Sequence, residues 1–121
     1  MSLIRLRPSH VAANNYAASL KSLGRFEEAK SLFRKAMRMA RRVLGEGSEL
    51  TLKMRWGYAR ALYEDDATTL DDLREAVTTL EDAERIARRV FGAAHPAAVG
   101  IGRSLENSRA ALRARETPST R

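Results

Sequence analysis

The sequence predicts an all-α fold, an α-solenoid of about two and a half helical hairpins that contains five helices. Apolar residues recur every three or four positions in five segments, and no segment alternates long enough to form a strand. The first and second of these segments have the same residue pattern as the third and fourth, as expected of a chain built from repeated units. With 121 residues, 44% of them hydrophobic, the chain can form one modest core and not two independent domains.

The first hairpin is expected to consist of two helices separated by Gly24. One helix should run from about Ser9 to Leu23, with an apolar face formed by Ala13, Tyr16, Ala17, Leu20 and Leu23. The next should begin at Phe26, and its stripe is formed by Ala29, Leu32, Phe33, Ala36, Met37, Ala40, Val43 and Leu44. Arginines near its end favour the helix dipole, and Gly45 is typical of a helix terminus.

The second hairpin is expected to begin with Ser48 as an N-cap. Its first helix should end near an acidic run and carries Leu50, Met54, Tyr58, Ala61 and Leu62. Thr69 and Asp72 resemble a capping box with Asp in place of Glu, which predicts the start of a fourth helix. That helix should end at Gly92, and its stripe is formed by Leu73, Ala76, Val77, Leu80, Ala83, Ile86, Ala87 and Val90.

A fifth helix is expected after Pro96, because proline is tolerated in the first helical turn, and the preceding His95 can cap it. Its face is formed by Ala98, Ile101, Leu105, Ser108 and Leu112. Residues 116–121 should form a flexible polar tail, and residues 1–10 an N-terminal extension or an expression leader.

The two hairpins are copies of each other. A shift of 42 residues places Tyr16 and Leu20 on Tyr58 and Leu62, and a shift of 47 places the second helix on the fourth. The difference is an insertion of five residues in the acidic turn between Leu62 and Ala76. Small residues recur at fixed places, which close helix packing requires: Ala17, Ala29 and Ala36, then Ala59, Ala76 and Ala83, with Phe33 and Leu80 filling the space between them.

Gly24-Arg25-Phe26-Glu27-Glu28-Ala29, preceded by Tyr16-Ala17 and followed by Phe33 and Ala36, resembles a tetratricopeptide repeat. The 42-residue period, the paired Asn14-Asn15, the Arg-Arg-Val-Leu-Gly ending and His95-Pro96 are similar more narrowly to the repeats of kinesin light chain. The resemblance implies a hairpin over 11–45, a second over 48–92, and a capping or truncated third-repeat helix over 95–115. The second unit departs from the family pattern at Trp56-Gly57 and Ser48-Glu49.

The resemblance also implies a non-enzymatic protein-binding module, because such repeats bind peptides along the concave surface formed by the first helix of each hairpin. Here that surface would be lined by Val11, Asn14, Ala18, Lys21, Lys53, Trp56, Arg60, Tyr63, Arg103 and Asn107. Four of these residues are basic and none is acidic, so an acidic peptide is the natural partner. Trp56 lies two residues before Tyr58 and should point away from the buried face, partly exposed as an anchor. Solvated bases and a core tryptophan are the alternative interpretation.

Charge leaves two other functions open. Residues 1–60 carry +9 and residues 61–121 carry −2, so repeat ends of opposite charge could associate as a homodimer, or the chain could be a purely structural repeat segment. The net charge of +7 and a basic flank on the second helix also permit electrostatic binding of nucleic acid. No recognition motif supports that alternative. The acidic segment Glu64 to Asp72 lacks the spacing of a calcium loop and is expected to be solvated.

The sequence contains few residues that could act in catalysis or bind a metal ion. The chain has no cysteine, and its two histidines, His10 and His95, are expected at helix starts and not as a catalytic pair. We find no phosphate-binding loop or nucleophile motif, and therefore expect no enzyme activity, cofactor or metal site. The N-terminus lacks the apolar run of a signal peptide, and no segment has the length of a membrane span, which predicts a cytoplasmic protein.

Overall fold

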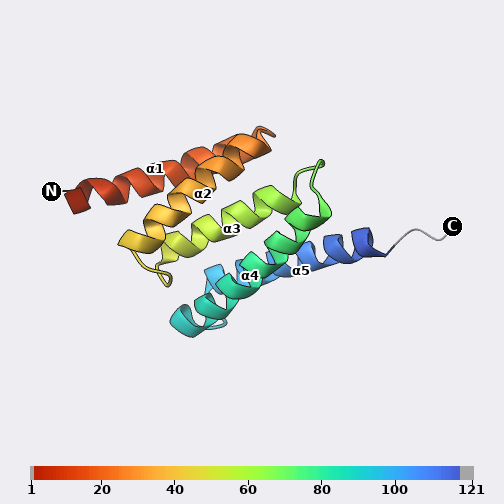
Figure 1. The fold of residues 1–121 in the computed structure, drawn as a ribbon. Helices are drawn as coiled ribbons and strands as arrows, with labels where there is room; N and C mark the ends of the chain where they lie inside the picture. Colours follow the sequence, from red (N-terminus) through yellow and green to blue (C-terminus); the bar gives the residue numbers. More distant parts are fainter. Residues whose placement is uncertain (1, 118–121) are drawn as a thin grey trace.

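The computed structural model describes residues 2–117, with side chains from His10 onward. It contains five helices: α1 (Ser2–Ser22), α2 (Phe26–Val43), α3 (Glu49–Tyr63), α4 (Leu70–Phe91) and α5 (Pro96–Glu116). Successive helices are joined by short turns and run antiparallel, so α1 and α2 form one hairpin and α3 and α4 a second (Figure 1). The expected tail residues 118–121 and Met1 lie outside the described residues.

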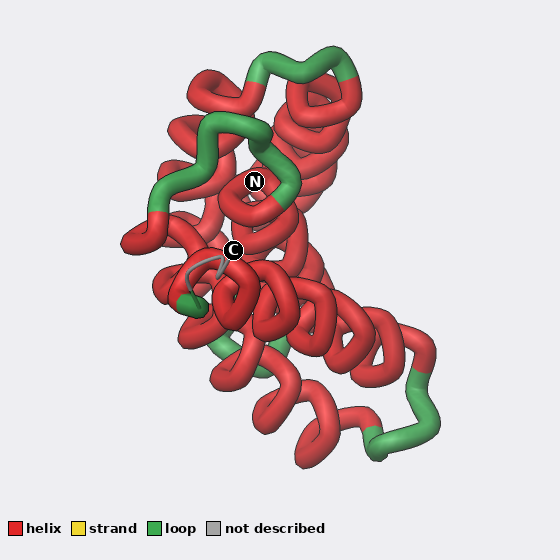
Figure 2. The backbone as a smooth tube through the Cα atoms, turned by 90° about the vertical axis from the view of Figure 1, so that its right-hand side faces the viewer, coloured by secondary structure: helices red, strands yellow, loops and turns green. Residues whose placement is uncertain are grey.

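The helices form an open array. α3 lies at the centre and contacts the other four helices, whereas among the described residues neither α1 nor α2 touches α4 or α5. The odd-numbered helices therefore follow one another as a row, α1 to α3 to α5. The two hairpins are stacked and tilted against each other (Figures 1 and 2). This confirms the all-α helical repeat that the sequence predicts, because a closed bundle would bring α1 against the last helices.

The helix ends follow the predicted chemistry with one exception. Gly24 and Gly45 have φ of +80° and +92°, the left-handed conformation that glycine adopts without strain at a helix terminus. Thr69 and Asp72 form the reciprocal capping box, and His95 Nδ1 accepts a hydrogen bond from the Ala97 amide at 3.0 Å. Ser48 occupies the N-cap position of α3, but its side chain makes no capping hydrogen bond.

The core lies where the repeated small residues bring the helices together. All six repeated alanines are buried, as predicted: Ala17, Ala29, Ala36, Ala59, Ala76 and Ala83. Phe33 of α2 is 1% exposed and lies over Gly57 of α3, where a Cβ atom would stand only 2.6 Å from the ring. Close approach of α2 and α3 therefore depends on the absence of a side chain at position 57.

Several apolar residues that helical spacing assigned to the core are exposed. Tyr16 is 59% and Leu23 72% exposed, and Val43 and Val90 also face solvent. The face of α1 that carries Tyr16 is uncovered because, among the described residues, no helix packs outside the first hairpin. Spacing identifies the apolar stripe of a helix, but it cannot tell whether a neighbour covers the whole stripe.

The N-terminal helix also differs from the expectation. α1 begins at Ser2 and not near Ser9, so residues assigned to an extension are helical. Pro8 removes one backbone N–H from this helix, but the leucines and arginines before it have high helix propensity. His10 consequently lies within α1 and not at its start, and it is buried.

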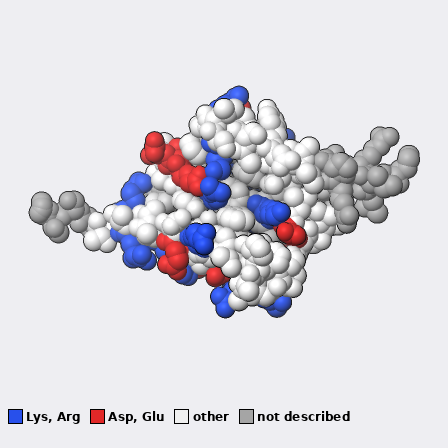
Figure 3. Space-filling model, turned by 180° about the vertical axis from the view of Figure 1, so that it is seen from behind, with Lys and Arg blue, Asp and Glu red and all other residues white. Residues whose placement is uncertain are grey.

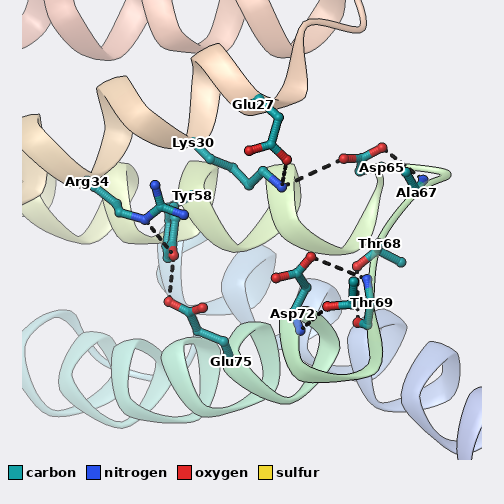
Figure 4. Close-up of polar contacts among 10 residues, drawn as sticks. All are labelled: Glu27, Lys30, Arg34, Tyr58, Asp65, Ala67, Thr68, Thr69, Asp72 and Glu75. Carbon is teal, nitrogen blue, oxygen red and sulfur yellow. Dashed lines mark hydrogen bonds and ion pairs between the residues drawn. The ribbon is translucent and has the colours of Figure 1, made fainter.

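The acidic segment after α3 is less solvated than expected. Lys30 of α2 is buried, and its ammonium group contacts Glu27 at 2.7 Å and Asp65 at 3.7 Å (Figure 4). Asp65 also accepts a hydrogen bond from the Ala67 amide at 2.9 Å, which stabilises the turn. A carboxylate in the inserted turn is thus the partner of a buried base, since a buried ammonium group requires an opposite charge.

Candidate functional site

A hollow of about 520 Å³ lies between α3 and α5. It is lined by Trp56, Arg60, Tyr63 and Glu64 from α3 and its C-terminal end, and by Pro96, Val99, Gly100, Arg103, Ser104 and Asn107 from α5. Five of the ten predicted groove residues therefore meet here: Trp56, Arg60, Tyr63, Arg103 and Asn107. Both helices belong to the odd-numbered row, so the hollow lies where successive first helices of the repeats face each other.

Trp56 forms the fixed apolar wall of this hollow. Its Nε1 donates a hydrogen bond to Ser104 Oγ at 2.8 Å, and its ring packs directly against Gly100 of α5. A side chain at position 100 would collide with the indole, so the absence of one at Gly100 lets the ring pack between the helices. Trp56 remains partly exposed, as predicted, but the expectation that it points away from the buried face is wrong, because its side chain packs against the core and α5. The hydrogen bond to Ser104 fixes its orientation before any ligand arrives.

The hollow also contains an acid, which contradicts the expectation of a purely basic lining. Glu64 accepts hydrogen bonds from Lys21 Nζ at 2.7 Å and from Arg60 Nε at 2.8 Å. Burial alone would raise the pKa of Glu64, but the hydrogen bonds from these two bases lower it below its ordinary value. Sequence reasoning missed Glu64 because it belongs to the acidic run after α3, outside the helical pattern used to choose the lining residues.

Arg103 and Asn107 are the groups left for a ligand. Both side chains are exposed on α5, and neither has a hydrogen-bond or ion-pair partner within residues 10–117. A guanidinium group offers a planar fork of N–H donors that matches a carboxylate, and an amide can bond to a peptide backbone. The hollow thus combines the apolar wall of Trp56, the carboxylate of Glu64, which is already paired with two bases, and the guanidinium of Arg103, which is unpaired within these residues.

The other predicted groove residues lie elsewhere. Lys53 lines a second hollow with Val11, Leu44, Ser48, Glu49 and Leu50, and its ammonium group is 3.5 Å from the carboxylate of Glu49. Asn14 is half-buried and Ala18 exposed on α1, and neither lines one of these two hollows. Lys21 reaches the α3–α5 hollow only through its bond to Glu64.

The α5 residues that complete the hollow had a detectable signal in the sequence. Pro96, Gly100, Arg103 and Asn107 follow one another at intervals of four, three and four residues, which places them on one helical face. Extending the predicted line from Arg103 and Asn107 toward the start of the helix would have found Pro96 and Gly100. Ser104 had no such signal, because its role depends on meeting the indole of Trp56 across the helix pair.

The charges on the surface are mixed. Viewed from behind relative to Figure 1, Lys and Arg side chains lie beside Asp and Glu side chains across the middle of the molecule, with larger uncharged areas next to them (Figure 3). A ligand on this side would therefore meet local pairs of opposite charge and not a uniform positive field. Within residues 2–117, no helix is both long enough and apolar enough to span a bilayer.

A comparison with models of protein families identifies the type of repeat. The family model described as Tetratricopeptide repeat matches residues 9–69, which cover the first hairpin from Ser9 onward, all of α3 and the turn after it. Neither the comparison with curated proteins nor that with solved structures finds a match.

Proposed function

This chain belongs to the tetratricopeptide repeat family, and from that premise we propose that it is a non-enzymatic module that binds a protein partner through an acidic peptide segment in the α3–α5 hollow. Repeats of this family generally mediate protein–protein interaction. The observation that carries the proposal is the meeting of Trp56, Arg60 and Arg103 around one hollow on the odd-numbered helices.

A peptide carboxylate is the group that this arrangement favours. Arg103 supplies a guanidinium with no partner in the described residues, and charge-assisted hydrogen bonds are stronger than neutral ones. Lys21 and Arg60 both donate hydrogen bonds to Glu64. A second carboxylate near them is therefore attracted by two positive charges and repelled by the single negative charge of Glu64. An apolar side chain next to the peptide acid would cover the exposed part of Trp56, whose orientation is already set by Ser104.

The finer assignments are part of the same proposal. The 42-residue spacing of Tyr16 and Tyr58 and the His95-Pro96 start of α5 support the narrower likeness to kinesin light chain repeats. We divide the chain into hairpins at 11–45 and 48–92, followed by a capping helix over 95–115. The mixture of charged and polar surface residues fits a cytoplasmic interaction module.

The test is a screen of acidic peptides against the wild type, followed by two charge reversals on α5. Arg103→Glu should weaken the selected peptides by at least about tenfold, because it removes a charge-assisted bond and adds repulsion. Arg113→Glu is the matched control, since this exposed arginine lies on the same helix and outside the hollow. Equal binding by Arg103→Glu, with circular dichroism showing intact helices, would refute the proposed site.

Nucleic-acid binding is the second candidate, because one observation favours it. A hollow on the outer side of α2 is lined by Lys35, Arg38, Met39, Arg41 and Arg42. Only Arg41 of these bases has an ion-pair partner within the described residues, Glu46 at 2.8 Å. This function predicts binding of unrelated single- and double-stranded oligonucleotides that weakens steeply with salt. Absence of binding at low salt would exclude it.

A further inference from the structure

The first hairpin presents an uncovered face at the N-terminal end of the array. Tyr16 lies there with 59% of its surface exposed, beside a hollow of about 400 Å³ that Glu28 and Leu32 of α2 also line. Leu20, Glu27, Ser31 and Lys35 complete its lining, so the charges at its rim are mixed. This face is separate from the α3–α5 hollow, and none of the groove residues lines it.

The second hairpin contains the covered version of the same face. Tyr58 is only 3% exposed, and its hydroxyl donates a hydrogen bond to Glu75 at 2.5 Å (Figure 4). Arg34, from the preceding hairpin, lies over the tyrosine, with its guanidinium carbon 5.5 Å from the ring centroid. Arg34 Nε also donates a hydrogen bond to the phenolic oxygen at 3.3 Å. A tyrosine, a glutamate and an arginine from a neighbouring helix thus form one contact across the repeat junction.

The repeat places the first two members of this contact on the open face. Tyr16 corresponds to Tyr58 by the shift of 42, and Glu28 corresponds to Glu75 by the shift of 47. The third member, the arginine, has no counterpart there among the described residues, because no helix packs outside α1 and α2. Glu28 now pairs with Arg25 at 2.7 Å, an exposed ion pair that is weak enough to rearrange so that Glu28 can accept a hydrogen bond from Tyr16.

We propose that this open face binds an amphipathic helix of another protein through an arginine that covers Tyr16 and donates a hydrogen bond to its hydroxyl, while that hydroxyl donates to Glu28. The internal chain of hydrogen bonds from Arg34 to the Tyr58 hydroxyl, and from that hydroxyl to Glu75, is the template for the geometry of the complex. Cation–π contact and a charge-assisted hydrogen bond then act on the same guanidinium.

The same internal contact also predicts the size of the residue that precedes the arginine in the partner helix. Phe33, the residue before Arg34, fits only because Gly57 of α3 has no side chain. The position that corresponds to Gly57 in the first unit is Asn15, whose side chain would occupy the space of the ring. The partner helix must therefore carry a small residue immediately before its arginine.

The other end of the array is built differently, which restricts docking to one end. By the shift of 47, Glu106 and Arg109 of α5 stand where α3 has the buried Ala59 and Leu62. Arg109 binds Glu81 at 3.0 Å and Glu106 at 3.5 Å, so charged side chains cover that surface. An apolar helix would bind weakly there, because the charged groups would have to be desolvated and this costs free energy.

A second copy of this chain fits the open face less well than a foreign helix does. The helix that corresponds to α2 in a second copy is α4, and α4 carries Glu81 at the position of Arg34. Docking α4 onto Glu28 would bring two carboxylates together, and like charges in contact destabilise an interface. Charge complementarity therefore favours a partner whose helix presents arginine.

The probe is a fluorescent peptide of residues 26–40 of this chain with Phe33→Ala, held helical by a side-chain cross-link. Fluorescence anisotropy at about 0.15 M salt should show binding to the wild type. The affinity should fall at least about tenfold for peptide Arg34→Gln and for protein variants Tyr16→Ala and Glu28→Gln. Glu106→Gln, which removes an exposed carboxylate at the charged end, and Arg103→Glu, in the groove, should leave the affinity unchanged.

A rescue experiment tests the geometry itself. The peptide that retains Phe33 should bind the wild type weakly and should gain affinity for the Asn15→Gly variant, in which the missing side chain recreates the space present at Gly57. Binding that is insensitive to Tyr16→Ala, or absence of rescue by Asn15→Gly, would overturn the proposal. A wild-type dimer in sedimentation that Tyr16→Ala converts to a monomer would also overturn it, because the face would then belong to a second copy.

Discussion

The packing of the two hairpins against each other can be tested at Gly57. Replacement by alanine adds one methyl group, and its carbon would lie 2.6 and 2.7 Å from two ring atoms of Phe33. That ring is buried between α2 and α3 and cannot swing into solvent, so the helices or the ring must shift. The substitution therefore perturbs the junction between repeats and little else.

Two effects of opposite sign determine the result. Overpacking in a tight core costs about 1–3 kcal/mol, and the upper part of this range applies because two ring atoms are involved. Alanine is favoured over glycine in a helix interior by about 1 kcal/mol. We expect Gly57→Ala to lower the free energy of unfolding by about 1–2 kcal/mol, which corresponds to a fall in Tm of about 4–8 °C for a chain of this size.

Urea denaturation followed by circular dichroism at helical wavelengths measures this change. Gly102→Ala is the matched control, because Gly102 also lies within a helix and its added methyl would meet only the flexible carboxylate of Glu84. That variant should be stabilised by up to about 1 kcal/mol. In the double variant Gly57→Ala with Phe33→Leu, the smaller side chain should recover part of the loss, with a coupling of about 1 kcal/mol.

A Gly57→Ala protein that is as stable as Gly102→Ala would refute the reasoning. It would mean that helix propensity alone decides the outcome, and that α2 and α3 do not meet at this point. Additive effects of Gly57→Ala and Phe33→Leu would lead to the same conclusion, because residues in contact are expected to be coupled.

Three further changes test the polar contacts. Burial, reinforced by the hydrogen bond to Glu75, raises the pKa of Tyr58 to about 12 from 10.0, so the proton is held more tightly in the folded than in the unfolded chain. The wild type should then lose stability relative to Tyr58→Phe as the pH rises from 10 toward 12, measured by urea titration at each pH. Glu64→Gln should lower the free energy of unfolding at neutral pH. The difference in stability between wild type and variant should vanish as the pH falls below 4.5 and through the lower pKa that Glu64 has in the folded chain. A difference in stability that persists in acid would contradict the ion-pair origin. Thr69→Ala should cost about 1 kcal/mol by removing the capping box of α4, whereas the neighbouring Thr68→Ala should have little effect on thermal unfolding.

Much of the fold could be predicted from local chemistry. The five helices, the glycines that end three of them and the capping box at Thr69 depend on residues close together in the sequence. The repeat of alanine positions was also sufficient to predict close packing, because a small residue that recurs at one place in each unit indicates that helices approach there. The start of α1 was wrong because Pro8 is an ambiguous signal near a helix terminus.

The candidate site could be predicted only in part. Helical register was enough to place Trp56, Arg60, Arg103 and Asn107 on the facing sides of α3 and α5. The presence of Glu64 in the hollow could not be inferred, because its position depends on how the turn after α3 folds back toward Lys21. Nor could the separation of Lys53 from the hollow, because Lys53 faces a hollow beside α1 and the α2–α3 turn.

The sequence by itself determined the helices, their order and the copying of one hairpin into the next, because these follow from periodicity and from short-range capping. Only the tertiary structure decided that two equivalent tyrosines differ in their surroundings. Tyr58 is covered by the arginine of a preceding hairpin, and Tyr16 has no such neighbour among the described residues. Burial is a property of what packs against a residue, so identical local sequence at two places in a repeat cannot reveal which copy is left open.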